Sequence, residues 1–406
     1  MIKCDFNKYT SKFISSNEKI KFNRNAKNAL NAFLKGELSY LNDLNTFINR
    51  DDLNKVLNVA EYVRGNCDVF IVIGIGGSFM GSKAIIDALL PTFGKKKPEI
   101  IFMGTDLSSD YCKEVIEHIK DKNIMINVIS KSGDTLETNI AFDIITYIMK
   151  GKYSDEEIKD RIIVTTDSKE GHLRRLSEEE GYFTLEIPEN VGGRFTVFTT
   201  VGLFPLAVAG IDILQLLEGF IKAETYIPLA IDYAVSRESL FKAGKYVESF
   251  TVYNPKLYYF TEWLKQLFAE TQGKNGKGIL PISNINTRDL HSLGQFIQEG
   301  SPIIFETVIG IENASEIFID KYKKTLNEIN RIAQVNVCEA HYKDKTPSIV
   351  IDIDYLNEYS IGEMVRFFMV AAIAGAILID VNPFGQPGVE KYKSLINASL
   401  KSVYIF

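Results

Sequence analysis

The feature that most constrains the fold is a short apolar run, residues 69–73, which ends in glycines and precedes a helical pattern. An apolar run without alternation is typical of a central parallel strand that is buried on both faces. Similar runs follow at 100–103, 124–129 and 161–165, and segments with helical spacing, such as 136–149, lie between them. Because strands that alternate with helices form a parallel sheet, this part of the chain is predicted to be an α/β domain.

A second series of the same kind begins after the apolar stretch 195–213. Its candidate strands lie at 250–253, 278–282, 302–308 and 348–352, with helices between them, notably at 256–271. The chain has 406 residues, which exceeds the size at which one hydrophobic core keeps growing. We therefore expect an α/β protein with two three-layer α/β/α domains and mainly parallel sheets, at 65–220 and 221–381.

The two ends of the chain show different patterns. Apolar residues recur at helical spacing from 26 to 63, so residues 1–64 are predicted to be a helical lead-in. The apolar stretch 364–379 contains Arg366 and is shorter than the run of about 20 residues that spans a bilayer, so it is predicted to be a buried helix. Residues 382–406 open with a loop rich in proline and glycine and should finish as a helix that closes over a domain and its active site.

Charge and cysteine content exclude several classes of protein. A net charge of −6 argues against a nucleic-acid binder, so an anionic substrate would need a local cluster of positive groups. The four cysteines are far apart and form no Cys-x-x-Cys pair, so neither a disulfide framework nor a metal site is expected. The N-terminus has no apolar signal-peptide core, which favours a cytoplasmic protein without a membrane partner.

A glycine-rich loop, residues 74–81, follows the first predicted strand and precedes a helix. Glycines let the backbone approach a ligand closely, and a helix start offers unpaired N–H groups to an anion. The dinucleotide fingerprint fails because Phe79 stands where its third glycine should be. A Walker A loop fails because Lys83 comes one position late. For an isolated loop of this kind, a tight turn between strand and helix is the favoured explanation.

A second loop, residues 130–138 with the sequence Ser-Lys-Ser-Gly-Asp-Thr-Leu-Glu-Thr, leads from a strand into an apolar helix. It combines four hydroxyls, a lysine and a helix N-terminus, and a phosphate dianion binds best where many donors meet a positive potential. The alternative is a hydroxyl-capped helix with Thr135 or Asp134 as N-cap.

This second loop resembles the phosphate-binding loop of sugar isomerase (SIS) domains. Residues 191–196, Val-Gly-Gly-Arg-Phe-Thr, resemble the signature arginine segment of the phosphoglucose isomerase family. Residues 380–393, which begin Asp-Val-Asn-Pro-Phe-Gly-Gln-Pro, resemble the C-terminal signature of that family. Residues 263–270 and 290–295 resemble the segments that hold the family's catalytic glutamate and histidine, in the family's order.

The resemblance implies two SIS-type domains and a reversible isomerisation of glucose 6-phosphate and fructose 6-phosphate, a step of glycolysis and gluconeogenesis. The reaction would pass through ring opening and an enediolate, without a metal or cofactor. The family's histidine comes from the neighbouring subunit, so a homodimer is implied in which His291 crosses the interface. The implied catalytic residues are Glu270, His291, Lys393 and Arg194, and the implied substrate-binding residues are Gly77, Ser78, Ser130, Lys131, Ser132, Thr135, Thr138, Gly193, Gln266 and Gln386.

The chemistry of these side chains suits the implied reaction. Glu270 suits the base that moves a proton between C2 and C1, and Gln266, four residues earlier, shares its helix face. Arg194 is permanently charged and suits a developing oxyanion. His291 and Lys393 are both candidates for proton transfer at the ring oxygen, and the sequence does not decide between them. Taken singly, each of these residues also fits an ordinary surface or structural role.

Three other functions are alternatives to this one. The nearest is another SIS-fold isomerase, for example one that acts on mannose 6-phosphate. An amidotransferase would need a glutaminase domain with an N-terminal cysteine nucleophile, whereas Cys4 stands in a short lysine-rich stretch. A sugar-phosphate sensor that binds DNA through its helical lead-in would need two helices joined by a recognition-type turn, and none is evident.

Overall fold

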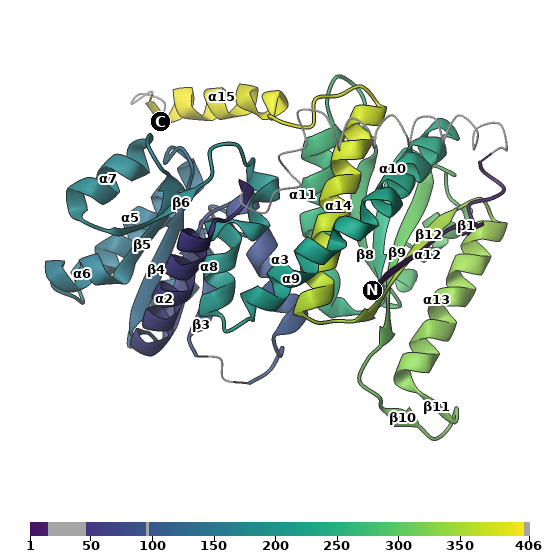
Figure 1. Ribbon diagram of the computed structural model, residues 1–406, viewed down its shortest axis with the longest axis horizontal. Coiled ribbons are helices and arrows are strands. Elements are labelled where there is room, and N and C mark those ends of the chain that lie inside the picture. The colour runs from purple at the N-terminus through teal and green to yellow at the C-terminus, as the bar shows by residue number, and fades with distance from the viewer. Residues whose placement is uncertain (15–45, 95–96, 402–406) are drawn as a thin grey trace.

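Two five-stranded sheets lie side by side in the computed structural model, which describes residues 1–14, 46–94 and 97–401 (Figure 1). Helices cover both sheets and fill the space between them, so each half has the three-layer α/β/α arrangement predicted from the sequence. The strands of the first sheet come from residues 69–187, and those of the second come from 247–355 and from the N-terminus. The boundary near residue 220 stays a prediction.

The first sheet is entirely parallel, with the order β3-β2-β4-β5-β6. Strand β6, whose residues alternate between apolar and polar, was not predicted from the sequence. This alternation fits an edge strand that is only partly buried. The strands are β2 (Val69–Ile73), β3 (Glu99–Met103), β4 (Ile124–Ile129), β5 (Ile162–Asp167) and β6 (Phe183–Ile187). The helices of this half are α2 (Arg50–Asn66), α3 (Met80–Leu89), α4 (Ser109–Ile119), α5 (Leu136–Lys150), α6 (Asp155–Arg161), α7 (His172–Glu180) and α8 (Thr200–Val208).

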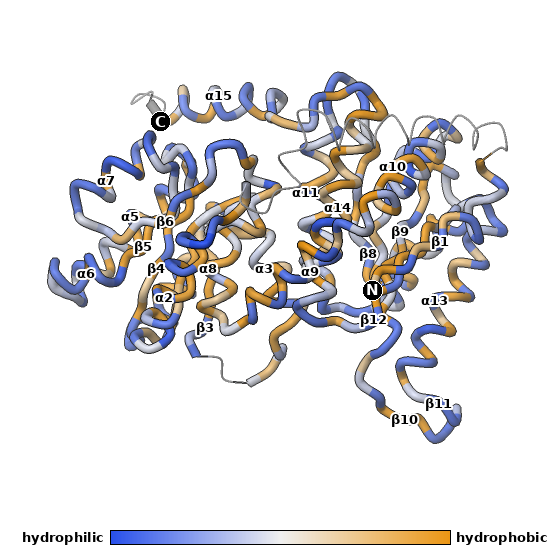
Figure 2. The backbone as a smooth tube through the Cα atoms, in the orientation of Figure 1, coloured by the Kyte–Doolittle hydropathy of each residue, from blue (hydrophilic) through white to orange (hydrophobic). Residues whose placement is uncertain are grey.

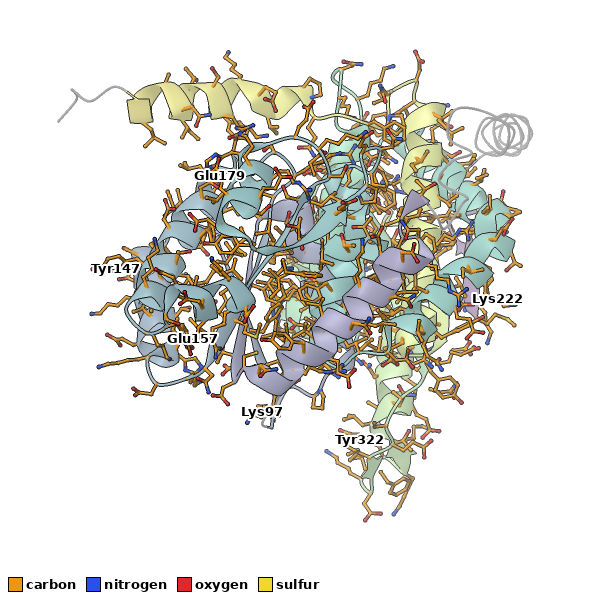
Figure 3. All side chains as sticks on the ribbon, turned by 60° about the vertical axis from the view of Figure 1, so that its left-hand side comes forward. Lys97, Tyr147, Glu157, Glu179, Lys222 and Tyr322 are labelled. Carbon is orange, nitrogen blue, oxygen red and sulfur yellow. The ribbon has the colours of Figure 1, made fainter. Side chains whose placement is uncertain are left out.

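The second sheet has the order β1-β12-β9-β7-β8. All of its strands except β1 are parallel to one another. Its parallel strands are β7 (Val247–Val252), β8 (Leu280–Ile285), β9 (Ile304–Asn313) and β12 (Ser348–Tyr355). Its helices are α9 (Ile213–Lys222), α10 (Ile227–Lys242), α11 (Tyr258–Gln272), α12 (Gly294–Glu299), α13 (Leu326–Lys343) and α14 (Glu358–Leu378). A small hairpin of β10 (Phe318–Ile319) and β11 (Lys324–Thr325) projects away from the body, with Tyr322 at its tip (Figure 3).

The N-terminal strand β1 (Ile2–Tyr9) corrects the prediction of a helical lead-in over residues 1–64. It pairs antiparallel with β12, with Cys4 opposite Ile351. The apolar residues Ile2, Cys4 and Phe6 alternate with polar ones, which is the period of an edge strand. The alternating pattern is short, and residues 2–9 form a strand only because they pair with β12. Helix α2 confirms the later part of the lead-in, whereas residues 15–45 lie outside the described residues.

The largest hydrophobic cluster contains residues of both halves, whereas a second cluster lies wholly within the first half. Helix α3 packs against α11, and α9 packs against α14. Aromatic pairs continue through this layer, for example Phe198 and Phe220 with ring centroids 4.4 Å apart. Figure 2 shows the hydrophobic segments gathered on the strands and on these inner helices. Tight packing of this kind fixes the loops of one half against those of the other.

Helix α14 is the buried helix predicted at 364–379. Of the helices in the described residues, it alone is long and apolar enough to cross a membrane, but 89% of its most apolar window is buried inside the protein. Arg366 lies within it and donates hydrogen bonds of 3.1 Å to the carbonyls of Phe220 and Ile221. A core helix of the second half therefore explains this apolar stretch.

The C-terminal segment contains the predicted loop and helix. After α14 the chain turns through the 3₁₀ helix η8 (Pro387–Val389) into α15 (Glu390–Lys401), which runs along the outside of the first half (Figure 1). Residues 391–400 are all exposed, and the main contact of α15 is with η8. The predicted loop and helix are both present, and the helix lies at the surface of the first half.

Candidate active site

The candidate site begins where β2 and β4 end. These parallel neighbours pair from Val69 with Ile124 to Ile73 with Val128. The chain leaves β2 toward β3 on one side, while β4 lies on the other, so the order of the sheet reverses between β2 and β4. Ligands of open α/β sheets bind at such a switch point, outside the carboxyl ends of the strands. The two loops that the sequence analysis selected follow these two strands and meet at this point.

The loop after β4 keeps several hydroxyls available. Ser130 is buried, and its Oγ accepts a hydrogen bond of 3.1 Å from the Gly133 amide. Thr135 occupies the N-cap position of α5, yet its side chain makes no capping hydrogen bond and lies 3.4 Å from Ser130 Oγ. Thr138 is buried, and its Oγ1 has no hydrogen-bond partner among the described residues. A ligand bound at this loop would therefore meet a hydroxyl that makes no other hydrogen bond among the described residues.

Local packing holds the backbone of this loop. Gly133 has a φ of +77°, and a Cβ there would lie 2.4 Å from the Leu173 amide nitrogen, so only glycine fits. Ser132 Oγ accepts a hydrogen bond of 3.2 Å from the Asp134 amide. Lys131 Nζ donates 2.5 Å to the carbonyl of Glu189, so its ammonium ties the loop to the segment after β6.

The glycine loop after β2 lies directly against the arginine segment. It forms the 3₁₀ helix η3 (Gly76–Ser78), which packs on η4 (Gly193–Phe198). A Cβ at Gly77 would lie 2.0 Å from the carbonyl oxygen of Gly193, so the two backbones touch. Thr196 Oγ1 donates 2.7 Å to the Gly193 carbonyl and 3.3 Å to the Gly77 carbonyl. This contact fixes the position of Arg194, the next residue of η4.

Arg194 joins the two halves of the protein. Its side chain is 2% exposed, and its Nη1 lies 3.3 Å from Glu270 Oε2. Its Nε donates 2.8 Å to Thr271 Oγ1, and its Nη2 donates to the carbonyl of Pro383. Burial lowers the pKa of the guanidinium, while Glu270 acts in the opposite direction. An arginine stays charged in proteins, so a buried, oriented cation faces the carboxylate.

Glu270 is held by donors on both of its oxygens. Gln266, one turn earlier on α11, donates from Nε2 to Oε1 at 3.1 Å. Gln386, from the C-terminal segment, donates from Nε2 to Oε2 at 2.8 Å. The Glu270 side chain is still 26% exposed, and Gln266 Oε1 is buried without a partner among the described residues. The carboxylate is therefore oriented and accessible, as a base that takes a proton from a ligand must be.

The segment that carries Gln386 is itself anchored, by residues that the sequence analysis did not select. Lys274 Nζ donates 2.7 Å to the Asn382 carbonyl and 2.8 Å to the Phe384 carbonyl. The ring of Phe384 packs edge-on against Phe195, with centroids 6.2 Å apart. Thr271 was also missed, although it directly follows Glu270. For Lys274, the only sequence signal is its position one turn beyond Glu270.

Two of the implied catalytic residues lie outside this cluster. His291 ends the 3₁₀ helix η7 (Arg288–His291) and is exposed. Lys393 lies on α15 with a side chain that is 52% exposed, and its Nζ lies 3.3 Å from Glu390 Oε1. No hydrogen bond or ion pair in the described residues joins either side chain to Arg194 or Glu270. The structure thus brings Arg194, Gln266, Glu270 and Gln386 together and leaves His291 and Lys393 apart.

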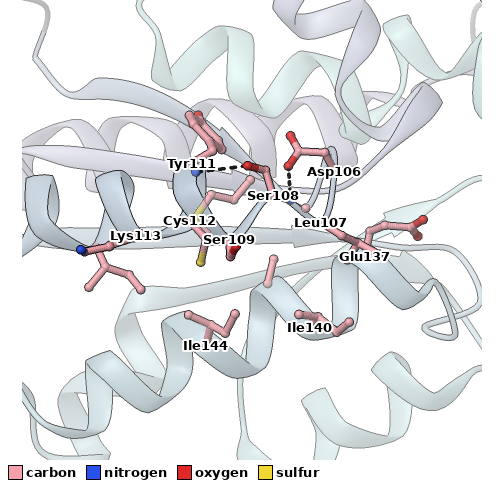
Figure 4. Close-up of a pocket in the computed structure, with 14 residues that line it drawn as sticks. Asp106, Leu107, Ser108, Ser109, Tyr111, Cys112, Lys113, Glu137, Ile140 and Ile144 are labelled. Atoms are coloured by element: carbon pink, nitrogen blue, oxygen red, sulfur yellow. Dashed lines mark hydrogen bonds between the residues drawn. The ribbon is translucent and has the colours of Figure 1, made fainter. Parts of the chain in front are cut away.

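An apolar cavity lies elsewhere, between α4 and α5 (Figure 4). It measures about 310 Å³, and Leu107, Ile140 and Ile144 are among its mainly apolar lining residues. Its charged residues are Asp106, Lys113 and Glu137, which offer one cation against two carboxylates. A phosphate dianion is bound where cationic groups outnumber carboxylates, so the cavity is a poor site for a sugar phosphate. No group of three metal-ligating side chains occurs in the described residues.

Comparisons with known proteins show the family of this chain. Residues 58–337 match the family model described as Phosphoglucose isomerase. A glucose-6-phosphate isomerase of Caldanaerobacter subterraneus is 41% identical over 377 residues, which cover 86% of this chain and 84% of that protein.

Solved structures with a similar fold are also known. The crystal structure of a hypothetical protein from Thermus thermophilus has a TM-score of 0.86 and 26% identity, and the match covers 99% of this chain and 100% of that one. A glucose-6-phosphate isomerase from Chlamydia trachomatis has a TM-score of 0.78 and 19% identity over 86% of this chain and 73% of that one, and it confirms the predicted fold. The chain therefore belongs to the phosphoglucose isomerase family.

Proposed function

We propose that this chain is the isomerase that interconverts D-glucose 6-phosphate and D-fructose 6-phosphate, with Glu270 as its base. Family membership supports the reaction, and the 41% identical relative carries the name of this enzyme. The observation that carries the assignment of the site is the contact between Arg194 and Glu270, which joins a buried cation to an accessible carboxylate beside the loops of the switch point. We also expect a cytoplasmic homodimer.

The phosphate group would bind at the loop 130–135 and the first turn of α5. Ser130, Ser132, Thr135 and Thr138 supply hydroxyls, and the start of a helix of 15 residues supplies backbone N–H groups and a positive potential. Lys131 adds charge close to this site, although its ammonium is used in the hydrogen bond to Glu189. The sugar would be lined by Gly77, Ser78 and Gly193. The two glycines have no side chain and Ser78 has a small one, so the backbone of η3 and η4 stays accessible.

The carbon chemistry would take place at Glu270. The carboxylate removes the C2 proton of the open-chain aldose, the C1–C2 double bond forms, and the C1 oxygen takes the negative charge. Arg194 stabilises this oxyanion, because an oriented cation in a buried site costs no reorganisation during the reaction. A proton passes from the C2 hydroxyl to the C1 oxygen, Glu270 returns its proton to C1, and C2 becomes the carbonyl of the ketose.

Ring opening needs a further proton donor and acceptor, and His291 and Lys393 are the candidates. We propose that His291 reaches the site from the partner subunit, because no hydrogen bond or ion pair in the described residues joins it to Glu270 of the same chain. Lys393 can act only if α15 moves from its exposed position onto the site. Such a movement would begin at the loop before η8, which also carries Gln386.

The first experiment follows the formation of glucose 6-phosphate from fructose 6-phosphate with a coupled assay, in the presence of a chelator. The wild type is expected to turn over, and Glu270→Gln is expected to bind the substrate without converting it. Glu262→Gln is the matched control, because Glu262 lies on the same helix and pairs with Lys265 at 2.6 Å.

Two results would count against the proposal. Activity on mannose 6-phosphate alone would assign the chain to another isomerase of this fold. Near-normal turnover of Glu270→Gln would remove Glu270 from the role of the base.

A further inference from the structure

The loop that carries Gln386 has no regular structure between α14 and η8, yet cations hold it at successive carbonyl groups. Lys277 Nζ donates 2.8 Å to the Ile379 carbonyl and 3.3 Å to that of Asp380. Arg194 donates to the carbonyl of Pro383. Lys274 bonds the carbonyls on either side of Pro383, those of Asn382 and Phe384. Lys277, in the loop between α11 and β8, therefore holds the start of this segment, whereas Lys274 and Arg194 hold the part that leads to Gln386.

We propose that Lys274 is a positioning residue for the isomerase: its ammonium group holds the backbone at Asn382 and Phe384 so that Gln386 reaches Glu270. This inference rests on the proposed function of Glu270. Its basis is geometric, because the two acceptors of Lys274 are the last anchored carbonyls before Gln386. A hydrogen bond from a charged donor is stronger than one from a neutral donor, so the protonated form of Lys274 anchors the loop best.

Titration of Lys274 follows from its surroundings. Burial lowers the pKa of its ammonium group from 10.5 to about 8; repulsion by Arg194 acts in the same direction, and attraction by Glu270 opposes both. Lys277, the other cation on this loop, donates to Ile379 and Asp380 instead. Arg194 stays charged over the working range, so it contributes no titration there.

The lowered pKa of Lys274 decides whether activity rises or falls with pH. Below about pH 8 Lys274 is charged and anchors the loop, and above it the charge is lost. The ratio kcat/KM reports groups of the free enzyme. We therefore expect kcat/KM of the wild type to fall as the pH rises through about 8, with a limb that depends on Lys274.

The test compares Lys274→Met, Lys274→Arg and Lys277→Met with the wild type, by kcat and KM for fructose 6-phosphate across the pH range. Loss of charged hydrogen bonds should lower kcat of Lys274→Met by about tenfold to hundredfold, with a smaller change in KM. Lys274→Arg keeps a permanent charge, so it should retain activity and lose the alkaline limb. Lys277→Met is the matched control: it loses two similar bonds farther from Gln386 and should keep the wild-type profile.

A double-mutant cycle separates positioning from general loss of structure. If Lys274 acts through Gln386, adding Lys274→Met to Gln386→Leu should cost little further activity. Independent effects that multiply would overturn the proposal, and so would an unchanged kcat and pH profile in Lys274→Met. Circular dichroism monitors folding; if Lys274→Met does not fold, Lys274→Gln takes its place in the cycle. An inactive wild type would instead contradict the proposed function itself.

Discussion

Gln386 Nε2 lies 2.8 Å from Glu270 Oε2, although 116 residues separate the two side chains along the sequence. Helix α11 supplies the carboxylate, and the loop after α14 supplies the amide. Because Gln266 bonds the other oxygen at 3.1 Å, the plane of the carboxylate is fixed by donors from two distant segments. Orientation of this kind contributes to catalysis by holding the base in the geometry of attack.

Replacement of Gln386 by leucine should therefore impair the reaction more than binding. The substitution keeps the volume of the side chain and removes the donor to Glu270. We expect kcat to fall about tenfold to hundredfold, the usual worth of a hydrogen bond to a charged group, while KM for fructose 6-phosphate changes little. Gln298→Leu, which removes a half-buried amide that donates to Asp344 and to the Ala340 carbonyl, should have normal kinetics. A rise in KM without a fall in kcat would place Gln386 in substrate binding instead.

Thr138 offers a sharp test of the phosphate loop, because α5 carries its own control. Thr138 and Thr146 both have a buried hydroxyl without a partner among the described residues. Thr138→Val should raise KM for fructose 6-phosphate by about tenfold to hundredfold, since a hydrogen bond to the dianion is lost. Thr146→Val, two turns further along α5, should leave KM unchanged. Equal effects of the two substitutions would mean that neither hydroxyl contacts the phosphate.

Arg194 should not tolerate lysine, although the charge is kept. Its three donor nitrogens bond Thr271, Glu270 and Pro383, and an ammonium group cannot match that planar geometry. We expect Arg194→Lys to lower kcat by about a hundredfold to a thousandfold, as the loss of an oxyanion donor does. Arg331→Lys is the control, because Arg331 bonds Asp352 through two nitrogens away from this site. Steady-state kinetics of both variants measure this effect. A similar, modest loss of kcat in the two variants would argue against a role for Arg194 in the transition state.

The order of strands and helices could be predicted from the sequence because apolar runs and helical spacing are local signals. Strand β1 could not, because its alternating residues become a strand only when β12 lies beside them. The same limit applies to the site. The motifs around Arg194 and Glu270 were evident, but nothing local to Lys274 indicates that its carbonyl acceptors lie 108 and 110 residues further along the chain.

The buried polar contacts of the second half also could not be predicted from the sequence. Arg237 on α10 and Glu248 on β7 are 1% and 0% exposed and form an ion pair of 2.5 Å. Tyr233 donates 2.6 Å to Glu248, and Gln272 accepts 3.0 Å from Arg237. From sequence, each of these residues fits an exposed helix face or strand edge equally well, since only the tertiary structure buries them together.

This buried pair predicts a large effect on stability. Arg237→Met leaves the Glu248 carboxylate buried without its cation, which should cost about 3–5 kcal/mol of unfolding free energy. Adding Glu248→Leu removes the unpaired charge and should recover much of that loss. Urea unfolding, followed by circular dichroism, measures both. Lys323→Met breaks a pair whose side chains are 77% and 88% exposed and should leave the unfolding midpoint unchanged. A small loss in Arg237→Met would show that Glu248 is neutralised in another way.

Mixing of inactive subunits tests whether His291 acts across a dimer interface. In a mixed dimer of Glu270→Gln and His291→Ala, one site would combine the native glutamate with the native histidine of the other chain. Refolding of the two variants together should therefore restore about a quarter of the wild-type activity, because half of the dimers are mixed and each has one intact site of two. Glu270→Gln mixed with Arg194→Ala should stay inactive, since both residues belong to the same site of one chain. No recovery in the first mixture, with dimers demonstrated by sedimentation, would mean that His291 serves its own subunit or neither.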